Sequence, residues 1–570
     1  MDLLSCAALS LATNLLGNLL GFTGGPEQLT GRQAFATSFI IQYLSLKFYR
    51  IFLYHKYFSP LRHLPGPKQS HWFLGQVLNQ VNANSPMEMW VMWSAEHPDA
   101  PFIRYMSFAN TEMVLVNSLE AHRQVLQVQN DFIERPNRVR RMIGRFGGDG
   151  LTSFEFEEYR AHRKTLSGCF TPECLRRLEP VFKEKAVQLN HFLGRAIEAS
   201  GGGSVVIDCT DTFGRYALDI MGRALLGMDF SYLESTVFNR DGNPVQGTQP
   251  YGFLSAHDAI FGPNKMGKIF SFLDTFFPVR WLPFRTNTEF LKATSWTSAT
   301  VRELVARKKQ EIGKTANKAN YDDTSRDILS FLVEESRPGG CAEGIRDTNM
   351  VGHLLILMAG GHETTSHTLA WSSHILATRP DIQDRLRGDI AGLAAQDLDP
   401  SFSDIDALDY LDNFVNEVLR VYPPAVWTPR QAYHDLQICG TYIPNGTMFE
   451  IVPAVIHMNP LIWGDDAAEV NPSRWDSIGA GTQARGGTDE YVDPRMSPFA
   501  FEAFSNGPKT CIGRKVALRE IKIALFEMVR RYRFLGVGEE DGVEPFTVET
   551  PGIVLRPKGM KVRVERIEGE

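Results

Sequence analysis

The chain has 570 residues, of which 43% are hydrophobic, 22% charged and 11% aromatic. This is the composition of a globular protein with a large core, and it excludes a disordered, collagenous or polytopic membrane protein. The formal net charge of −7 excludes the basic excess of a dedicated nucleic-acid binder, so we expect no nucleic-acid partner. The seven cysteines include no CxxC pair, which favours a reducing compartment.

The N-terminus predicts a membrane segment. Residues 3–22 form an uncharged apolar run of about the length that crosses a bilayer. We rank an anchor above a cleaved signal peptide, because Asp2 stands where a signal peptide has basic residues. A second apolar run, residues 34–46, leads into the basic and aromatic residues typical of a membrane interface. We therefore predict a membrane anchor and interfacial segment over residues 1–58; the alternative is two amphipathic helices packed on the body.

A proline-rich stretch separates this segment from the rest of the chain. Residues 59–68 contain Pro60, Pro65 and Pro67, each of which fixes φ and removes a backbone donor. The stretch predicts a stiff spacer, followed by one folded body over residues 69–570. The basic residues before the spacer place that body on the cytosolic side of a membrane, by the positive-inside rule.

The body is predicted to be mainly α-helical with small β-sheets. Apolar residues recur at helical spacing from about residue 85 to 440, with glycine and proline breaks between the segments. Short alternating or β-branched runs predict strands at residues 112–116, 436–443 and 553–564. The polar run 477–494 predicts a surface loop. No glycine-rich nucleotide loop follows a strand, so we expect no electron-donor domain within the chain.

The segment around Cys511 predicts a metal ligand. It reads Phe504-Ser-Asn-Gly507-Pro-Lys509-Thr-Cys511-Ile-Gly513 and leads into a long amphipathic helix. The positive end of that helix and Lys509 favour the thiolate form of Cys511, which can ligate a metal. Gly507 and Gly513 would let the backbone approach a flat group on which Phe504 could pack. The alternative is a buried structural cysteine.

This loop resembles the haem-binding loop FxxGxRxCxG of the cytochrome P-450 superfamily. Phe504, Gly507, Cys511 and Gly513 match, and Lys509 stands where the family has arginine. The resemblance implies haem b (iron protoporphyrin IX) as cofactor, with Cys511 as the axial ligand of the iron and a thiolate that favours O–O cleavage. Lys509 would keep a positive charge for a haem propionate but lose the bidentate fork of arginine.

A second stretch resembles the family's oxygen-binding signature, [AG]Gx[DE]TT. It contains Gly360, Gly361, Glu363 and Thr364 in that order. The resemblance implies that Thr364 contacts bound oxygen and that Glu363 supplies protons through water. The alternative for the threonine is a hydrogen bond to a carbonyl one turn earlier in a helix. Three histidines in the same stretch lack the spacing of a helical metal pair and are interpreted as core or solvated residues: His353, His362 and His367.

A third motif resembles the family's ExxR helix. Glu417 and Arg420 stand three residues apart, and two prolines follow closely. Residues 471–475, NPSRW, resemble the family's PERF segment with serine and tryptophan substituted. The resemblance implies a scaffolding network of Glu417, Arg420 and Arg474 beneath the haem; the alternative for the first two is an ordinary surface ion pair.

Two further basic residues match family positions that meet the haem propionates. Tyr159 and Arg163 resemble the WxxxR helix with tyrosine in place of tryptophan, and Arg430 follows the ExxR helix before the first small sheet. A buried propionate without a cation is costly, so the resemblance implies that Arg163 and Arg430 bind propionates. The alternative for both is a surface arginine.

The motifs together span about residues 60–566 in the family's order. They imply that residues 69–570 are the haem-binding catalytic domain of a monooxygenase. The enzyme would insert one atom of dioxygen into a lipophilic small molecule, by hydroxylation, epoxidation or oxidative coupling. The anchor and spacer resemble fungal microsomal members that modify terpenoid or polyketide secondary metabolites. The resemblance further implies an NADPH-cytochrome reductase as partner and a place on the endoplasmic reticulum membrane, with the catalytic domain facing the cytosol.

Two alternatives to this function stay open. The first keeps the haem-thiolate but uses it for isomerisation, dehydration or peroxide-driven chemistry. The second, of another class, is a non-catalytic haem-binding sensor or carrier, which would consume no NADPH in response to a substrate. For the enzyme, we expect residues 138–149 and 251–277 to line an apolar substrate pocket.

Overall fold

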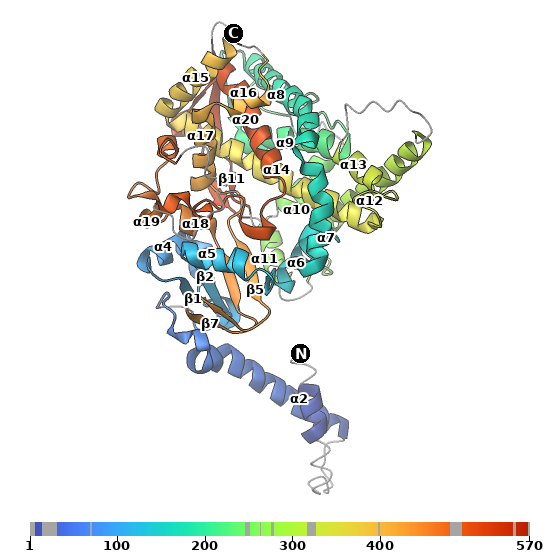
Figure 1. Ribbon diagram of the computed structural model, residues 1–570, viewed down its shortest axis with the longest axis vertical. Coiled ribbons are helices and arrows are strands. Elements are labelled where there is room, and N and C mark those ends of the chain that lie inside the picture. Colours follow the sequence, from blue (N-terminus) through green and yellow to red (C-terminus); the bar gives the residue numbers. More distant parts are fainter. Residues whose placement is uncertain are drawn as a thin grey trace.

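The computed structural model describes residues 6–13, 31–68, 71–245, 251–262, 264–274, 279–315, 327–396, 399–478, 493–550 and 554–567. The chain is mainly helical with small β-sheets, as predicted (Figure 1). The helices are α2 Gly31–Phe48, α3 Val77–Asn82, α4 Glu88–Glu96, α5 Leu119–Arg123, α6 Asn137–Gly147, α7 Phe156–Ser167, α8 Pro172–Ser200, α9 Cys209–Leu226, α10 Phe253–Phe261, α11 Lys265–Asp274, α12 Arg285–Thr315, α13 Ile328–Glu335, α14 Asp347–Thr378, α15 Pro380–Ala394, α16 Phe402–Asp406, α17 Asp409–Val421, α18 Pro453–His457, α19 Pro460–Trp463 and α20 Arg514–Arg531.

The strands in the described residues form four small sheets. They are β1 Phe102–Met106, β2 Glu112–Val116, β3 Ile133–Glu134, β4 Ser204–Asp208, β5 Thr428–Ala432, β6 Leu436–Ile438, β7 Thr441–Ile443, β8 Met448–Ile451, β9 Tyr532–Leu535, β10 Thr547–Glu549, β11 Arg556–Lys558 and β12 Lys561–Arg566. The largest sheet has the order β1-β2-β8-β5-β3, and only its β2–β8 pair is parallel. The others have the orders β4-β12-β9, β10-β11 and β6-β7.

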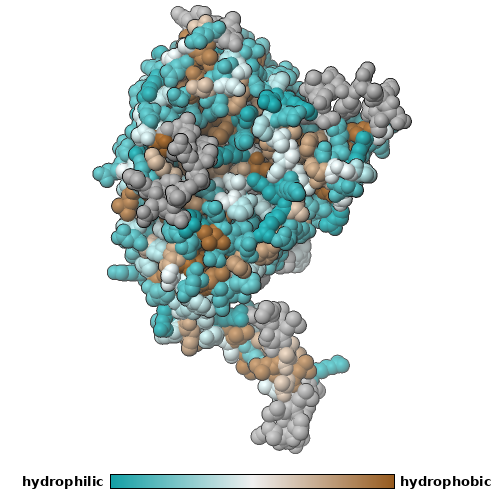
Figure 2. All heavy atoms as spheres, viewed as in Figure 1, coloured by the Kyte–Doolittle hydropathy of each residue, from teal (hydrophilic) through white to brown (hydrophobic). Residues whose placement is uncertain are grey.

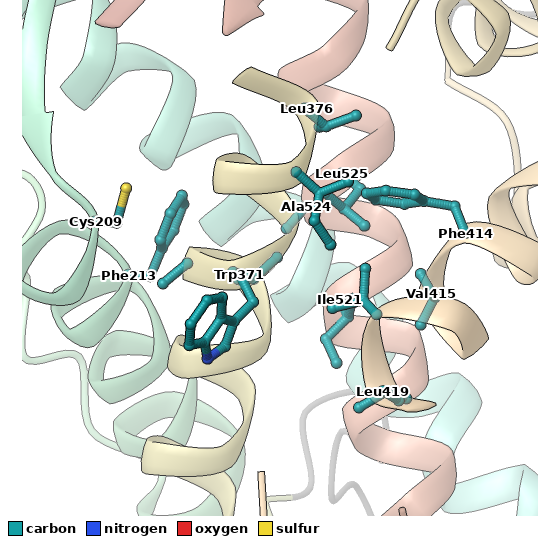
Figure 3. Close-up of a cluster of buried hydrophobic side chains, with 14 of the residues drawn as sticks. Cys209, Phe213, Trp371, Leu376, Phe414, Val415, Leu419, Ile521, Ala524 and Leu525 are labelled. Atoms are coloured by element: carbon teal, nitrogen blue, oxygen red, sulfur yellow. The ribbon is translucent and has the colours of Figure 1, made fainter. Parts of the chain in front are cut away.

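Helix α14 lies in the middle of the helical body and packs on α9, α12, α17 and α20 (Figure 1). Buried side chains of four of these helices meet in one cluster (Figure 3), to which α9 gives Phe213, α14 gives Trp371, α17 gives Phe414 and α20 gives Leu525. Each fully buried large apolar side chain stabilises the fold by about 1.5–3 kcal/mol. The cluster therefore holds α14 and α20, which border the candidate site, in a fixed relation.

The predicted strands are confirmed, with turns inside two of them. Residues 112–116 form β2. Residues 436–443 divide into β6 and β7, joined at Cys439 (φ 48°) and Gly440 (φ 72°), and positive φ at both central residues is what a type I′ hairpin requires. The C-terminal run divides into β11 and β12 at Gly559 (φ 75°). Most of the loop predicted at 477–494 lies outside the described residues.

The N-terminal segment extends away from the body (Figure 1). Helix α2 continues into a π-helical segment, Tyr49–Phe58. The exposed apolar residues of α2 are Ile40, Ile41, Leu44 and Phe48, and Figure 2 shows brown, hydrophobic surface on this extended segment. Of the predicted anchor run 3–22, the structure describes residues 6–13, which are helical. Within the described parts of the chain, no helix combines the length and apolar character needed to cross a bilayer.

The proline-rich stretch packs against the body. The Ser59 hydroxyl lies 2.8 Å from both carboxylate oxygens of Glu112 in β2, and the Arg104 N–H of β1 donates to the Pro65 carbonyl at 2.8 Å. Leu61 is only 1% exposed. These contacts tie residues 59–65 to the edge of the largest sheet.

Candidate active site

A cavity of about 320 Å³ lies between α14 and the loop that precedes α20. Helix α14 contributes Gly360 and Thr364 to its wall, and the loop contributes Cys511 and Gly513. A Cβ atom added to Gly360 or Gly513 would meet no atom within 4 Å, so the space beside both glycines is open. Most of the lining is apolar, as is usual for small-molecule sites. The fold thus brings two separate sequence motifs to one cavity.

Cys511 faces this cavity from a loop held by the backbone. Its N–H donates to the Phe504 carbonyl at 2.8 Å, and its side chain is exposed to the cavity. Desolvation by the surrounding protein raises the pKa of the Cys511 thiol, and the backbone N–H of Gly513, together with the charges of Arg163 and Arg514, opposes that rise. The position of Cys511 just before α20 favours the thiolate, as expected, but desolvation has the larger effect on the pKa of the thiol.

Lys509 does not act on Cys511 as we expected. Its ammonium forms a buried ion pair with Glu134 of β3, and Nζ lies 3.4 Å from the Ile133 carbonyl. Desolvation lowers the pKa of Lys509 to about 8, with the Glu134 carboxylate opposing the shift. The charge of Lys509 is therefore compensated by Glu134, and the expectation that this lysine promotes the thiolate is not met. Lys509 still lines the cavity, and its contact with a propionate stays a prediction.

Of the residues predicted to bind propionates, Arg163 and Lys509 line the cavity, whereas Arg430 lies outside the lining. Arg163 and Tyr159 of α7 line the cavity, and Arg163 Nη1 donates to the Thr510 carbonyl at 2.8 Å. Arg430 of β5 is 4% exposed, and desolvation lowers its pKa to about 9, with the charge of the nearby Arg135 acting in the same direction. The two arginines are thus not ordinary surface residues.

Arg135 is a site residue that the sequence did not indicate. It lines the cavity beside Tyr159, and its Nη1 is buried without a hydrogen-bond partner among the described residues. A buried guanidinium nitrogen without an acceptor is costly, so this edge of the cavity suits an anionic group. Haem carries two propionates, and these residues therefore fit it. The only local signal for Arg135 is the following Pro136, which restricts its backbone but indicates no chemistry.

Thr364 lines the cavity from an unbroken helix. Helix α14 runs continuously through Gly360 and Gly361, so the two glycines do not interrupt it. The Thr364 hydroxyl donates to the Gly360 carbonyl at 2.6 Å, which is the alternative hydrogen bond one turn earlier. Gly361 allows the close approach of α9, because a Cβ there would lie 2.4 Å from Met221 Sδ. Oxygen contact by Thr364 stays a prediction, and its hydroxyl would have to rotate to make it.

Glu363 lies outside the cavity lining and faces α10. Its side chain is 6% exposed, and Oε1 lies 3.7 Å from His257 Nε2. Desolvation raises the pKa of Glu363 to about 8, with Asp258 adding to the shift and Arg556 opposing it. At neutral pH the carboxyl therefore holds a proton. A buried carboxylic acid with a pKa near the working pH is suited to giving that proton up.

The histidines of α14 are core residues, as interpreted from the sequence. His353, His362 and His367 are at most 4% exposed, and desolvation is the main cause that lowers the pKa of each. His362 Nε2 lies 3.0 Å from the Gly214 carbonyl. In the portion of the chain that the structure describes, no group of three or more His, Cys, Asp or Glu residues is arranged to hold a metal ion.

The predicted network around Glu417 is present. Glu417 accepts from Arg420 Nε and Nη2, both at 2.8 Å, and from Arg474 Nε at 2.9 Å. Glu417 and Arg420 are 0% exposed and Arg474 is 8% exposed, so the surface-pair alternative does not apply. The substituted Trp475 adds to the network, because its indole N–H donates to Glu417 Oε2 at 2.9 Å.

Two expectations about the cavity wall differ from the structure. Gly507 has φ 71°, and a Cβ there would lie 2.2 Å from the Leu126 carbonyl oxygen, so the close approach it permits is to the backbone at Leu126 rather than to the cavity. Phe504 does line the cavity, as expected. None of the described residues of 138–149 or 251–277 belongs to the lining, because α7 and α14 lie closer to it.

Comparison with known proteins agrees with this geometry. Residues 65–564 match the family model described as Cytochrome P450. The chain is 27% identical over 504 residues to Cytochrome P450 monooxygenase sphH of Aspergillus fumigatus, covering 86% of each chain. It is 28% identical over 521 residues to Cytochrome P450 monooxygenase FUM15 of Gibberella moniliformis, covering 84% of this chain and 83% of the relative. Because the family model matches most of its length, the chain belongs to the cytochrome P450 family.

Proposed function

We propose that the protein is a haem-thiolate monooxygenase that inserts one atom of dioxygen into a lipophilic small molecule of the terpenoid or polyketide kind, with haem b as cofactor. The observation that carries the proposal is that Cys511, Thr364 and Arg135 line the same cavity, and that Arg135 Nη1 has no hydrogen-bond partner among the described residues. The cavity offers a metal-ligating thiol, a hydroxyl and a cation within one largely apolar space. Haem bound through Cys511 supplies the redox chemistry that activates dioxygen.

The residues of this chain divide the remaining tasks. Arg135 and Arg163 bind and orient the propionates, and the apolar lining excludes water from the substrate. The Thr364 hydroxyl, which donates to the Gly360 carbonyl, rotates so that it donates into the cavity instead. Glu363 holds a proton on its carboxyl at neutral pH and releases it toward the cavity through water.

The proposal includes the chain's surroundings. Residues 1–58 anchor it to the endoplasmic reticulum membrane, with residues 69–570 facing the cytosol. The exposed apolar residues of α2 and the basic Lys47, Arg50 and Lys56 support this arrangement. Electrons come from a separate NADPH-cytochrome reductase, since the sequence contains no nucleotide-binding fingerprint of its own.

The test is isotope incorporation by the reconstituted enzyme. The purified protein with an NADPH-cytochrome reductase would be supplied with ¹⁸O₂ and a panel of terpenoids, polyketides and fatty acids. We expect one ¹⁸O atom in each product molecule and substrate-dependent NADPH consumption, both absent in Cys511→Ala. Products without new oxygen would support the isomerase or dehydratase alternative, and products formed only with added peroxide would support the peroxygenase. A haem-loaded protein that binds panel members but never consumes NADPH in response would support the sensor or carrier alternative.

A further inference from the structure

The Glu363 carboxyl has an imidazole neighbour on another helix. His257 of α10 places Nε2 3.7 Å from Glu363 Oε1 and 2.9 Å from His362 Nδ1. The side chain of His257 is 14% exposed, against 6% for Glu363, so the histidine is the more accessible partner. One nitrogen of His257 thus lies near two different acceptors, the carboxyl and the second imidazole.

Hydrogen-bond partners determine the tautomers of both histidines. His362 Nε2 lies 3.0 Å from the Gly214 carbonyl oxygen, which can only accept, so this nitrogen carries the hydrogen. Because desolvation lowers the pKa of His362 to about 4, the ring is neutral at pH 7 and its Nδ1 is an acceptor. The nitrogen facing that acceptor, His257 Nε2, must then carry a hydrogen. His257 is therefore a donor, and Glu363 lies close to the donated hydrogen.

The histidines around the pair are neutral where Glu363 titrates. Desolvation keeps His257 neutral, because it lowers the pKa of His257 well below 6.5, and the neighbouring His367 has its pKa lowered to about 3. Glu363, whose pKa burial raises to about 8, thus changes charge in a pH range where the imidazoles beside it stay neutral. Four groups act on His257 or Glu363 directly: His362 and His367 from α14, Asp258 from α10 and Arg556 from β11. Asp211 and Arg215 from α9 act on Asp258.

We propose that His257 is a positioning residue for proton delivery: its Nε2–H bonds to His362 while Glu363 is protonated and turns to the Glu363 carboxylate once that group has released its proton. The proposal rests on the monooxygenase function and extends it. A shortening of about 0.8 Å, from 3.7 Å to the usual N–H···O distance of about 2.9 Å, completes the switch. No covalent bond of the histidine forms or breaks.

The consequence is that proton release from Glu363 becomes easier. A hydrogen bond to the charged form of a carboxyl favours that form and lowers its pKa. Without the His257 donor, the buried carboxylate would be less stable and Glu363 would retain its proton to higher pH. His257 thereby keeps the acid near the working pH, where proton donation is effective.

An infrared pH titration of the holoenzyme tests this directly. The carboxylic C=O band of Glu363, assigned by its loss in Glu363→Gln, should titrate near pH 8 in the unaltered enzyme. In His257→Phe, which fills the space without a donor, we expect the midpoint to rise by about one pH unit. His257→Gln, whose amide can donate, should return the midpoint toward that of the unaltered enzyme. His374→Phe is the matched control, because His374 is another histidine with a pKa lowered by desolvation on a different turn of α14.

A second measurement needs no variant of His257. In protein labelled with ¹⁵N-histidine, the Nε2 resonance of His257 should shift with a midpoint near pH 8, and the shift should be absent in Glu363→Gln. Turnover with reductase and a panel substrate gives a third readout, in which His257→Phe should release several-fold more hydrogen peroxide per NADPH than the His374→Phe control. His257→Gln should restore the coupling.

An unchanged infrared midpoint in folded His257→Phe, or a His257 resonance that does not respond to Glu363, overturns the proposal. Both measurements report the Glu363–His257 pair without requiring product formation. A shifted midpoint in a protein that incorporates no oxygen would therefore contradict the monooxygenase function but support the pairing.

Discussion

Replacing Glu417 by glutamine removes the one carboxylate that Arg420 and Arg474 share. Arg420 is completely buried and donates to Glu417 through two nitrogens, and Arg474 is 8% exposed and donates through one. An amide in place of the carboxylate leaves both guanidiniums without charge compensation from this residue and sets an NH₂ group against their donors. Breaking a buried ion pair in this way costs about 3–5 kcal/mol.

This cost translates into a modest but measurable shift of the melting temperature. At about 2.1 cal/mol/K per residue, a chain of 570 residues unfolds with an entropy of about 1.2 kcal/mol/K. A loss of about 4 kcal/mol divided by that entropy lowers Tm by about 3 °C. The large size of the chain, rather than weakness of the network, keeps the shift small.

The assay is thermal unfolding followed by tryptophan fluorescence, with Glu120→Gln as the matched control. Glu120 forms an i,i+3 pair with Arg123 like the pair in the network, but its side chain is 49% exposed. An exposed pair contributes about 1 kcal/mol or less, so the control should shift Tm by less than about 1 °C. Equal shifts in Glu417→Gln and Glu120→Gln would refute the argument that burial makes this network structural.

Three further predictions follow from the site. Arg135→Leu should speed haem loss about 10- to 100-fold, because a charge-assisted hydrogen bond contributes about 1.5–3 kcal/mol. The haem-free protein should keep or gain thermal stability. Haem transfer to apomyoglobin measures the rate of haem loss, and thermal unfolding of the haem-free protein measures its Tm. Gly507→Ala should lower the yield of folded protein, since φ is 71° and a carbonyl oxygen would lie 2.2 Å from the new Cβ, whereas Gly513→Ala, with open space at its Cβ, should fold normally. Thermal stability should be greatest near pH 6.5 and fall on both sides in a pH series of Tm values. Above this pH the folded protein retains protons that the unfolded chain has lost, on Glu363 and Glu450, whose pKa values burial raises to about 8. Below it the unfolded chain gains protons that the folded one cannot take up, on the buried His353, His362, His367 and His457, whose pKa values burial lowers to about 3 or 4.

Sequence patterns anticipated the features that depend on local spacing. The helix after Cys511 and the strand at residues 112–116 follow from apolar periodicity, and both are present. The Glu417–Arg420 contact follows from a spacing of three on one helix. Its burial does not, because an exposed pair has the same spacing, and Arg474 joins it from a segment far along the chain.

Contacts between distant segments are where sequence reasoning was incomplete. Lys509 pairs with Glu134, more than 370 residues earlier, so its expected effect on the thiolate depended on a partner that no local pattern shows. Arg135 and His257 belong to no recognisable motif, and their roles become visible only when β3 and α10 pack near α7 and α14. Gly507 was expected to let the backbone approach a flat group, but the group that it approaches is the Leu126 carbonyl.

The measurement that tests the central claim most directly is the reduced, carbon-monoxide-bound difference spectrum of the protein beside its Cys511→Ala variant. The account predicts a thiolate-type Soret shift in the unaltered protein and its loss in the variant, because the Cys511 side chain lies exposed in the cavity that Arg135 and Arg163 also line. A thiolate-type shift that persists in Cys511→Ala, or no such shift in folded, haem-loaded protein, would contradict it.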